Sequence, residues 1–324
     1  TSGNFVKLTS NSDAGKITVT SRKRHSDGEV FDIIRASSNC LNRCDSPLQN
    51  VIGRSRELQQ LVQMLNSRGI RSVACIGEPG IGVTSVVLSC AKFISERNMF
   101  DDVYFINLDR EEGSLRDLIC KILTLSDSYS TDAEMMTRFK ERYVSQKILL
   151  VIDGCDTSKK NIDSKICRVL EGMGVTLFLG IRHVETTRIG VPHIKMDEGL
   201  AKRSVRIERL SDQHIALLFL RASPRNLTLS ELRYLSETEL IDLKSFDDVV
   251  MSFSTSKIVC SLRGSASVAV RVASYINASV DLTKEKFEKE IIEKIVPRIS
   301  KQVQNRSTSK SGRRDRLRRI MSVY

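Results

Sequence analysis

The segment Gly77-Glu-Pro-Gly-Ile-Gly-Val-Thr-Ser85 combines residue types that can bind a polyphosphate. Its glycines allow backbone N–H groups to approach phosphate oxygens, and the amino end of a following helix would add partial positive charge. The spacing of Gly77 and Gly82 and the hydroxyl of Thr84 fit the pattern G-x-x-x-x-G-K-[ST], in which the hydroxyl binds Mg²⁺. Val83 occupies the Lys position, so we expect anion binding to persist and phosphoryl transfer to be weakened. Taken alone, the segment also fits a plain strand-to-helix turn.

A second candidate for chemistry lies further along the chain. The apolar run Ile148–Ile152 is followed by Asp153, an arrangement typical of a Walker-B strand, whose carboxylate holds Mg²⁺ beside a phosphate loop. A strand that ends in Asp is common, but its order after the glycine-rich segment strengthens the interpretation. We therefore predict that Thr84 and Asp153 are metal ligands.

Short apolar runs alternate with helical patterns around these two candidates. The run Ser72–Ile76 is typical of a strand buried on both faces, and the spacing within Val83–Ile94 predicts an amphipathic helix. Four more apolar runs predict strands at 103–108, 148–152, 175–179 and 205–207, and helical spacing recurs at 58–65, 115–125, 133–144 and 162–170. Strands alternating with helices predict a mainly parallel sheet covered on both sides, which is a three-layer α/β/α domain.

The strand signal disappears after Leu210, and helical spacing continues to Val296. This change indicates a second, all-helical unit. We predict four parts of the chain: a linker or the edge of an upstream domain at 1–50, the α/β domain at 51–210, a helical subdomain at 211–296 and a basic linker at 297–324.

The composition excludes several classes of protein. Of the 324 residues, 40% are hydrophobic and 28% are charged, which excludes a wholly disordered chain, a collagen-like repeat and a coiled-coil rod. The net charge of +12 is concentrated at the end of the chain, where residues 297–324 hold nine basic residues and one acid. The nearly neutral centre argues against nucleic acid as a partner. No apolar run is long enough to span a membrane.

The eight cysteines are scattered singly, apart from Cys40 and Cys44. Such scatter fits a reducing, intracellular setting, and the close pair lacks the second pair of ligands that a zinc site needs.

Several ordered motifs between residues 51 and 296 resemble the NB-ARC class of STAND-type P-loop NTPases, which is found in apoptotic and plant-immunity regulators. The segment Val51–Leu58 is similar to the family motif that lies by the adenine, and the two candidates above match its phosphate loop and Walker-B strand. Arg182 follows a strand that resembles the one ending in the family's sensor arginine, which reads the terminal phosphate. The segment Val259–Val270 resembles the Gly-Leu-Pro-Leu-Ala motif, with Ala266 in place of the Pro that packs on adenine.

The resemblance implies a parallel-sheet P-loop NTPase followed by a helical ARC subdomain, with the start of a winged-helix subdomain within 297–324. It implies ADP or ATP and Mg²⁺ as cofactors and assigns catalytic roles to Asp153 and Arg182. The residues that it marks as contacting the nucleotide are Ile52, Gly53, Arg54, Gly77, Gly80, Ile81, Gly82, Val83, Thr84, Ser85, Gly264 and Ala266.

Three departures from the family pattern bear on activity. Val83 replaces the phosphate-loop Lys, Gly154 replaces the acid that usually follows the Walker-B Asp, and Ala266 replaces the Pro. These losses favour a regulatory nucleotide switch with weak or absent hydrolysis, in which ADP or ATP sits between the α/β and helical units. The alternative is a pseudo-NTPase interaction scaffold that binds no nucleotide, and a fully active ATPase is the least favoured hypothesis.

The resemblance also implies partners beyond the nucleotide. Family members act through flanking domains, so we expect protein partners, a homo-oligomer in the full-length protein and a cytoplasmic location. Because the chain begins at Thr1 without a Met, we expect it to be a piece of a longer protein.

Overall fold

The computed structural model describes residues 51–108, 146–156, 170–172, 174–182, 203–228, 246–276 and 285–305, six single positions (134, 137, 141, 231, 232 and 234) and three short strands before residue 51. The described residues form two compact units. The first comprises residues up to Gly77 together with Val83–Ile207, and the second comprises Glu78–Gly82 together with the residues from Glu208 onward. The glycine-rich loop therefore packs with the helical residues rather than with the strand that precedes it.

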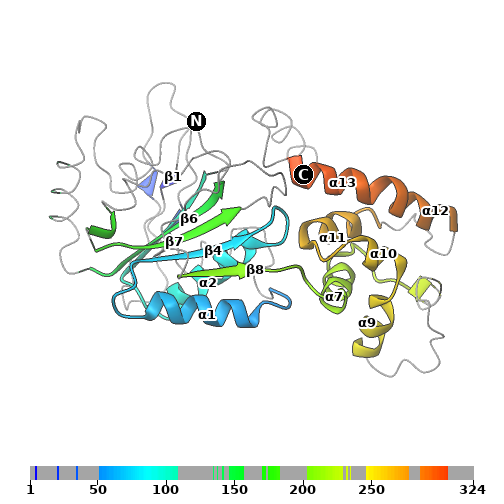
Figure 1. The fold of residues 1–324 in the computed structure, drawn as a ribbon, viewed down its shortest axis with the longest axis horizontal. Helices are drawn as coiled ribbons and strands as arrows, with labels where there is room; N and C mark the ends of the chain where they lie inside the picture. The colour runs from blue at the N-terminus through cyan, green and yellow to red at the C-terminus, as the bar shows by residue number, and fades with distance from the viewer. Residues whose placement is uncertain are drawn as a thin grey trace, which may run out of the picture. The chain divides into compact units, whose positions relative to one another are not determined.

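The first unit is built on a sheet with the strand order β3-β5-β6-β7-β4-β8. Figure 1 labels four neighbouring strands of this sheet, β6, β7, β4 and β8. Five of these strands run parallel: β4 (Ser72–Gly77), β5 (Asp102–Asn107), β6 (Ile148–Asp156), β7 (Thr176–Arg182) and β8 (Ser204–Ile207). Their side chains are buried almost throughout, as expected for a parallel sheet covered on both faces.

The N-terminal residues contribute short strands. The strand β3 (Ile34–Arg35) pairs antiparallel with β5 and extends the edge of the sheet, so part of the segment predicted as a linker joins the α/β unit. The strands β1 (Asn4–Phe5) and β2 (Thr20–Ser21) pair only with each other.

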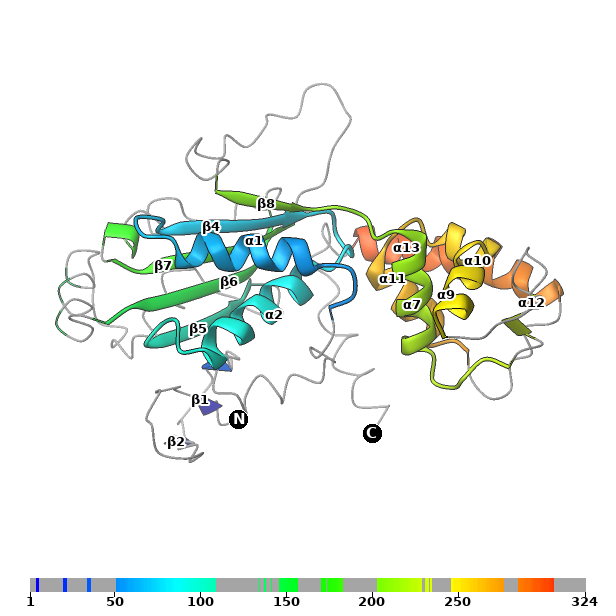
Figure 2. The same cartoon turned by 90° about the horizontal axis from the view of Figure 1, so that it is seen from below.

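Helices α1 (Ser55–Asn66) and α2 (Val83–Glu96) lie side by side against the sheet, as Figure 2 shows. Each helix buries an apolar stripe, which includes Leu61 and Leu65 on α1 and Val86, Cys90 and Ile94 on α2. The predicted helices at 115–125, 133–144 and 162–170 fall almost wholly outside the described residues. The parallel sheet with its flanking helices confirms the predicted fold class, a three-layer α/β P-loop NTPase fold.

The second unit is helical, as the sequence predicts. It contains α7 (Asp212–Ala222), α9 (Phe246–Ser254), α10 (Lys257–Ser261), α11 (Ala266–Ala273), α12 (Glu285–Glu290) and α13 (Val296–Asn305), with a π-helical turn over Ile291–Ile295. Phe219 and Phe253 meet in its core with ring centroids 5.4 Å apart. The side chains of Ser211 and Ser256 cap α7 and α10 by accepting hydrogen bonds from the first-turn amides.

Helix α13 carries the helical core past Val296, where we placed the end of the subdomain. Ile299 and Val303 are buried against the other helices. The π-helical turn ends just before Pro297, which has no N–H to continue the ordinary helical hydrogen bonds. The predicted start of a winged-helix subdomain lies outside the described residues. No described helix is both long and apolar enough to cross a membrane.

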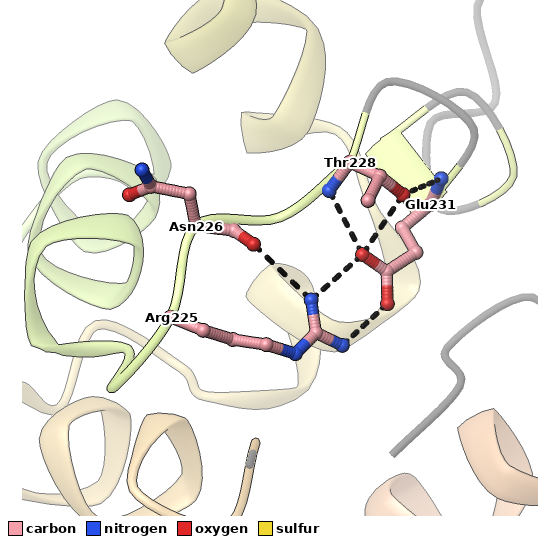
Figure 3. A network of polar contacts seen from close by, with 4 residues as sticks. All are labelled: Arg225, Asn226, Thr228 and Glu231. Atoms are coloured by element: carbon pink, nitrogen blue, oxygen red, sulfur yellow. Dashed lines mark hydrogen bonds and ion pairs between the residues drawn. The ribbon is translucent and has the colours of Figure 1, made fainter. Parts of the chain in front are cut away.

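A polar network fixes the chain just after α7 (Figure 3). Arg225 donates two hydrogen bonds to the carboxylate of Glu231, at 2.8 and 2.5 Å. Thr228 and Glu231 form a capping box, because the Thr228 N–H donates to the Glu231 carboxylate at 2.8 Å and the Glu231 N–H donates to the Thr228 hydroxyl at 3.3 Å. The carboxylate of Glu231 is thus buried with its charge compensated.

Candidate functional site

The glycine-rich loop connects the end of β4 to the first residue of α2 and is built around a tight turn. The Ile81 N–H donates to the carbonyl of Glu78 at 3.2 Å, and Gly80 has φ +85°. With Pro79 at the second position and Gly80 at the third, these values define a type II turn. Gly82 follows with φ +109°, a conformation that side chains rarely adopt. The Pro-Gly pair therefore shapes the loop locally.

Thr84 and Asp153 meet across the first unit. Thr84 lies in the first turn of α2, and its hydroxyl donates to Asp153 Oδ2 at 2.9 Å. Asp153 lies near the carboxyl end of β6 and is only 1% exposed. A hydroxyl and a carboxylate are oxygen ligands of the kind that Mg²⁺ prefers, so the pair fits a metal that takes its remaining ligands from water and phosphate. Among the described residues, no group of three or more His, Cys, Asp or Glu could hold a metal by itself.

Two glycines make room for the Asp153 carboxylate. A Cβ added to Gly180 on β7 would overlap Oδ1 of Asp153. Gly154 has φ +81° at the point where the register between β6 and β7 shifts, between Ile152 and Cys155. The glycine at 154, noted above as the loss of an acid, thus also meets a backbone requirement of this strand.

The negative charge of Asp153 affects the pKa of a cysteine thiol in the neighbouring core. Burial raises the pKa of the Cys75 thiol on β4, and the Asp153 carboxylate raises it further. Burial alone raises the pKa of Cys90 on α2 to about 12. Both thiols are therefore protonated and unreactive at neutral pH.

Arg182 is the last residue of β7. In the sheet it lies opposite Gly77 of β4 on one side and Asp156 of β6 on the other. It is therefore next to the residue at which the glycine-rich loop begins. A guanidinium in this place suits phosphate geometry, while its role as a sensor stays a prediction.

Val83 and Ser85 differ in their surroundings although both lie at the start of α2. Val83 is 4% exposed and belongs to the apolar stripe of the helix. Ser85 is exposed. The Lys position is thus taken up by a core side chain.

In the second unit the loop is attached to the amino end of α11. The Ser267 N–H donates to the carbonyl of Gly80 at 2.8 Å, and the Ser265 hydroxyl lies 3.4 Å from the same oxygen. The first amides of a helix have no partner within the helix, so the loop carbonyl serves as a cap. A Cβ added to Gly82 would lie 3.9 Å from that of Ala266, so the structure brings these two predicted residues together.

The rest of the loop environment also comes from the helical unit. A Cβ added to Gly80 would overlap Val303 of α13. The Glu78 carboxylate pairs with Arg209 at 3.2 Å. Gly264, with φ +70°, accepts a hydrogen bond from the Leu210 N–H at 3.1 Å.

The Ile52–Arg54 segment precedes α1 in the first unit. Gly53 has φ +68°, and Arg54 is 4% exposed, with its guanidinium 2.9 Å from the Glu57 carboxylate. Arg54 therefore has a structural role at the start of α1. The contact with adenine that the resemblance implies stays a prediction.

Sequence reasoning missed four residues around the loop and the Asp153 carboxylate: Gly180, Arg209, Ser267 and Val303. Gly180 had a usable signal, because a glycine inside a buried strand often marks a close approach. The other three are ordinary residues whose contacts depend on chain segments far away in sequence.

Comparisons with known proteins give distant relatives. No family model matches the sequence. The chain is 26% identical over 168 residues to an ATP-dependent Clp protease ATP-binding subunit ClpA homolog of Guillardia theta, covering 49% of this chain and 19% of the relative. It is 25% identical over 168 residues to the ClpA homolog of Cyanidium caldarium, covering 49% and 18%. The matched region is thus about a fifth of the length of these relatives.

The solved structures that resemble this chain share lower sequence identity with it than the ClpA homologs do. Caenorhabditis elegans PCH-2 aligns with a TM-score of 0.46 and 14% identity, covering 88% of this chain and 76% of that one. CDC6P from Pyrobaculum aerophilum aligns with a TM-score of 0.44 and 16% identity, covering 74% and 64%. The parallel sheet with its flanking helices, and the glycine-rich loop between β4 and α2, have the arrangement of a P-loop NTPase fold.

Proposed function

We propose that this chain binds ADP or ATP with Mg²⁺ and serves as a regulatory switch module of a STAND-type signalling protein, with weak or absent hydrolysis. The observation that carries the proposal is the 2.9 Å hydrogen bond from the Thr84 hydroxyl to Asp153. It joins the helix that follows a glycine-rich loop to the carboxylate of a buried strand. The NB-ARC class, the purine base, the intracellular setting and the assembly with other copies or partners rest on the resemblance alone.

Three of the roles in this proposal follow from general chemistry. Thr84 and Asp153 would hold Mg²⁺, which neutralises charge on phosphate oxygens when bound. Backbone amides at the start of α2 would face the phosphates, because the amino end of a helix favours anions. Arg182 beside Gly77 would add positive charge at the same sheet edge.

We expect weak hydrolysis because of the residues at positions 83 and 154. Val83 is buried and carries no charge, and Gly154 carries no carboxylate to orient a water. Phosphoryl transfer depends on positioned charge, so the loss of both groups slows it. If Val83→Lys gave no higher turnover than the wild type, this part of the proposal would be wrong.

The test of binding is calorimetry of the chain with ADP and ATP in the presence and absence of Mg²⁺. A ligand that binds the folded state raises its unfolding free energy by RT ln(1 + [L]/Kd), so a melting shift provides an independent readout. Thr84→Val removes the hydroxyl and should lower the Mg²⁺-dependent part of the affinity, whereas Thr84→Ser should keep it. Absence of binding and of a melting shift at millimolar nucleotide would refute the proposal.

One observation favours the alternative, an interaction scaffold without nucleotide. The Ile81 N–H donates within its own turn, and the Gly80 carbonyl is held by α11. These contacts hold part of the loop in shape without a ligand. The scaffold hypothesis predicts that nucleotide leaves the melting temperature unchanged.

A further inference from the structure

Arg209 reaches the glycine-rich loop from a distant part of the chain. It follows β8 by two residues, and its guanidinium lies 3.2 Å from the carboxylate of Glu78, the first residue of the loop after Gly77. The two side chains are 60% and 41% exposed. Ion pairs this exposed contribute little to stability, so Arg209 can leave Glu78 at little cost.

The backbone of Arg209 is anchored beside the same helix end that holds the loop. A Cβ added to Gly264 would lie 2.7 Å from the Cβ of Arg209, and the Leu210 N–H donates to the Gly264 carbonyl. The residue after Gly264 is Ser265, whose hydroxyl lies 3.4 Å from the Gly80 carbonyl. One turn at the start of α11 thus positions both the loop and the base of the Arg209 side chain.

The loop lacks the cation that its sequence pattern normally carries. The Lys of the phosphate-loop pattern reaches the outer phosphates, and here that position is the buried Val83. Guanidinium offers paired N–H donors that match phosphate oxygens and is always charged. Arg209 is an exposed guanidinium already bound to a loop residue.

We propose that Arg209, which lies in the same unit as the loop residues Glu78–Gly82, binds the phosphates of the nucleotide at this loop, whose sequence pattern has lost its Lys. In the structure Glu78 holds the guanidinium at the loop, and a bound polyphosphate competes with Glu78 for it. This assignment rests on the proposed nucleotide binding and goes beyond it by naming the side chain that recognises the phosphates and the acid that restrains it.

The test is a set of titrations with ADP and adenosine on the whole chain. Arg209→Gln should weaken ADP binding roughly fivefold to tenfold and leave adenosine binding unchanged, because a charge pair near the surface is worth about 1 kcal/mol or slightly more. Arg209→Lys should recover part of the loss. The matched control is Arg221→Gln, which removes an exposed guanidinium from the last turn of α7.

Replacing Glu78 should change the ADP affinity in a direction that a purely structural role of the ion pair would not produce. Glu78→Gln should strengthen ADP binding roughly two- to threefold, since it releases Arg209 and removes a nearby negative charge. In the Arg209→Gln background the gain should shrink, because no guanidinium remains to be released. If the ion pair only stabilised the loop, either single substitution would weaken binding.

The outcomes separate this inference from the proposed function. If the wild type binds neither ADP nor ATP, the proposed function fails and the role of Arg209 fails with it. If the wild type binds ADP and Arg209→Gln matches Arg221→Gln, only the role of Arg209 is refuted. A loss of affinity in both Arg209→Gln and Glu78→Gln would also overturn it, and circular dichroism confirms that each variant is folded.

Discussion

Replacing Gly180 by Ala tests whether the Asp153 carboxylate occupies the place that the structure gives it. Gly180 pairs with Cys75 in the middle of the sheet. An added Cβ would overlap Asp153 Oδ1 and would come within 3.2 Å of Val87 Cγ2. The overlap lies inside a closely packed unit, so either the carboxylate or the strand must shift.

The size of the effect follows from two contributions. Inserting a methyl group into a packed core costs about 1–3 kcal/mol. If the carboxylate moves away, the hydrogen bond from Thr84 is lost as well, and hydrogen bonds to charged groups contribute roughly 1.5–3 kcal/mol. We expect the unfolding free energy to fall by about 1–3 kcal/mol if only the strand shifts and by about 2.5–6 kcal/mol if the carboxylate moves. At an m-value of about 2 kcal/mol/M, the larger loss lowers the urea midpoint by roughly 1–3 M.

Urea unfolding followed by circular dichroism measures this change, and Gly172→Ala is the matched control. No heavy atom lies within 4 Å of a Cβ added to Gly172, which is helical and has no positive φ. Alanine there should raise stability by about 0.5–1 kcal/mol, because glycine is a poor helix residue. Gly180→Ala should also weaken any Mg²⁺-dependent nucleotide binding. Equal urea midpoints for the two variants would refute the placement of Asp153.

Three further substitutions probe other parts of the structure. Gly154→Asp should lower the urea midpoint by an amount equivalent to about 1 kcal/mol, because the position has φ +81°. Cys90 keeps its proton in the folded state while the unfolded thiol loses it above pH 9.0, so stability present below that pH is lost as the pH rises toward 12. The fall in unfolding free energy between pH 9 and pH 11, measured from urea midpoints, should therefore be smaller in Cys90→Ala than in the wild type by about 1 kcal/mol per pH unit. Arg225→Ala leaves the buried carboxylate of Glu231 without its guanidinium and should cost about 2–3 kcal/mol in a thermal melt, with Arg225→Lys recovering only part.

Much of the first unit could be predicted because its signals are local. The apolar runs that became β4 to β8 are bounded by turns, and the Pro-Gly pair specifies the type II turn of the loop. The nearness of Thr84 and Asp153 could be expected as well, since carboxyl ends of parallel strands share one edge of a sheet. These inferences need only a few neighbouring residues each.

The order of the strands could not be predicted from such signals. The strand β7 lies between β4 and β6, although it follows both in the chain. Nothing in its apolar run differs from the other runs, because pairing depends on how whole strands and crossovers pack together. For the same reason the sequence does not predict the ion pair of Glu78 and Arg209. These two residues are 131 positions apart in the chain.

The retained motif residues do not by themselves distinguish a nucleotide binder from a scaffold. Gly80 and Gly82 are required by positive φ values, and the Thr84 hydroxyl donates to a buried carboxylate. Each of these residues would be needed for folding even if no ligand ever bound, because a side chain in the left-handed region or an unpaired buried charge is costly. The exposed Arg209 is not required for folding in this way, since its ion pair with Glu78 contributes little to stability. A change in ADP affinity on replacing Arg209, without a change in melting temperature, therefore separates ligand binding from folding more cleanly than any substitution within the motif.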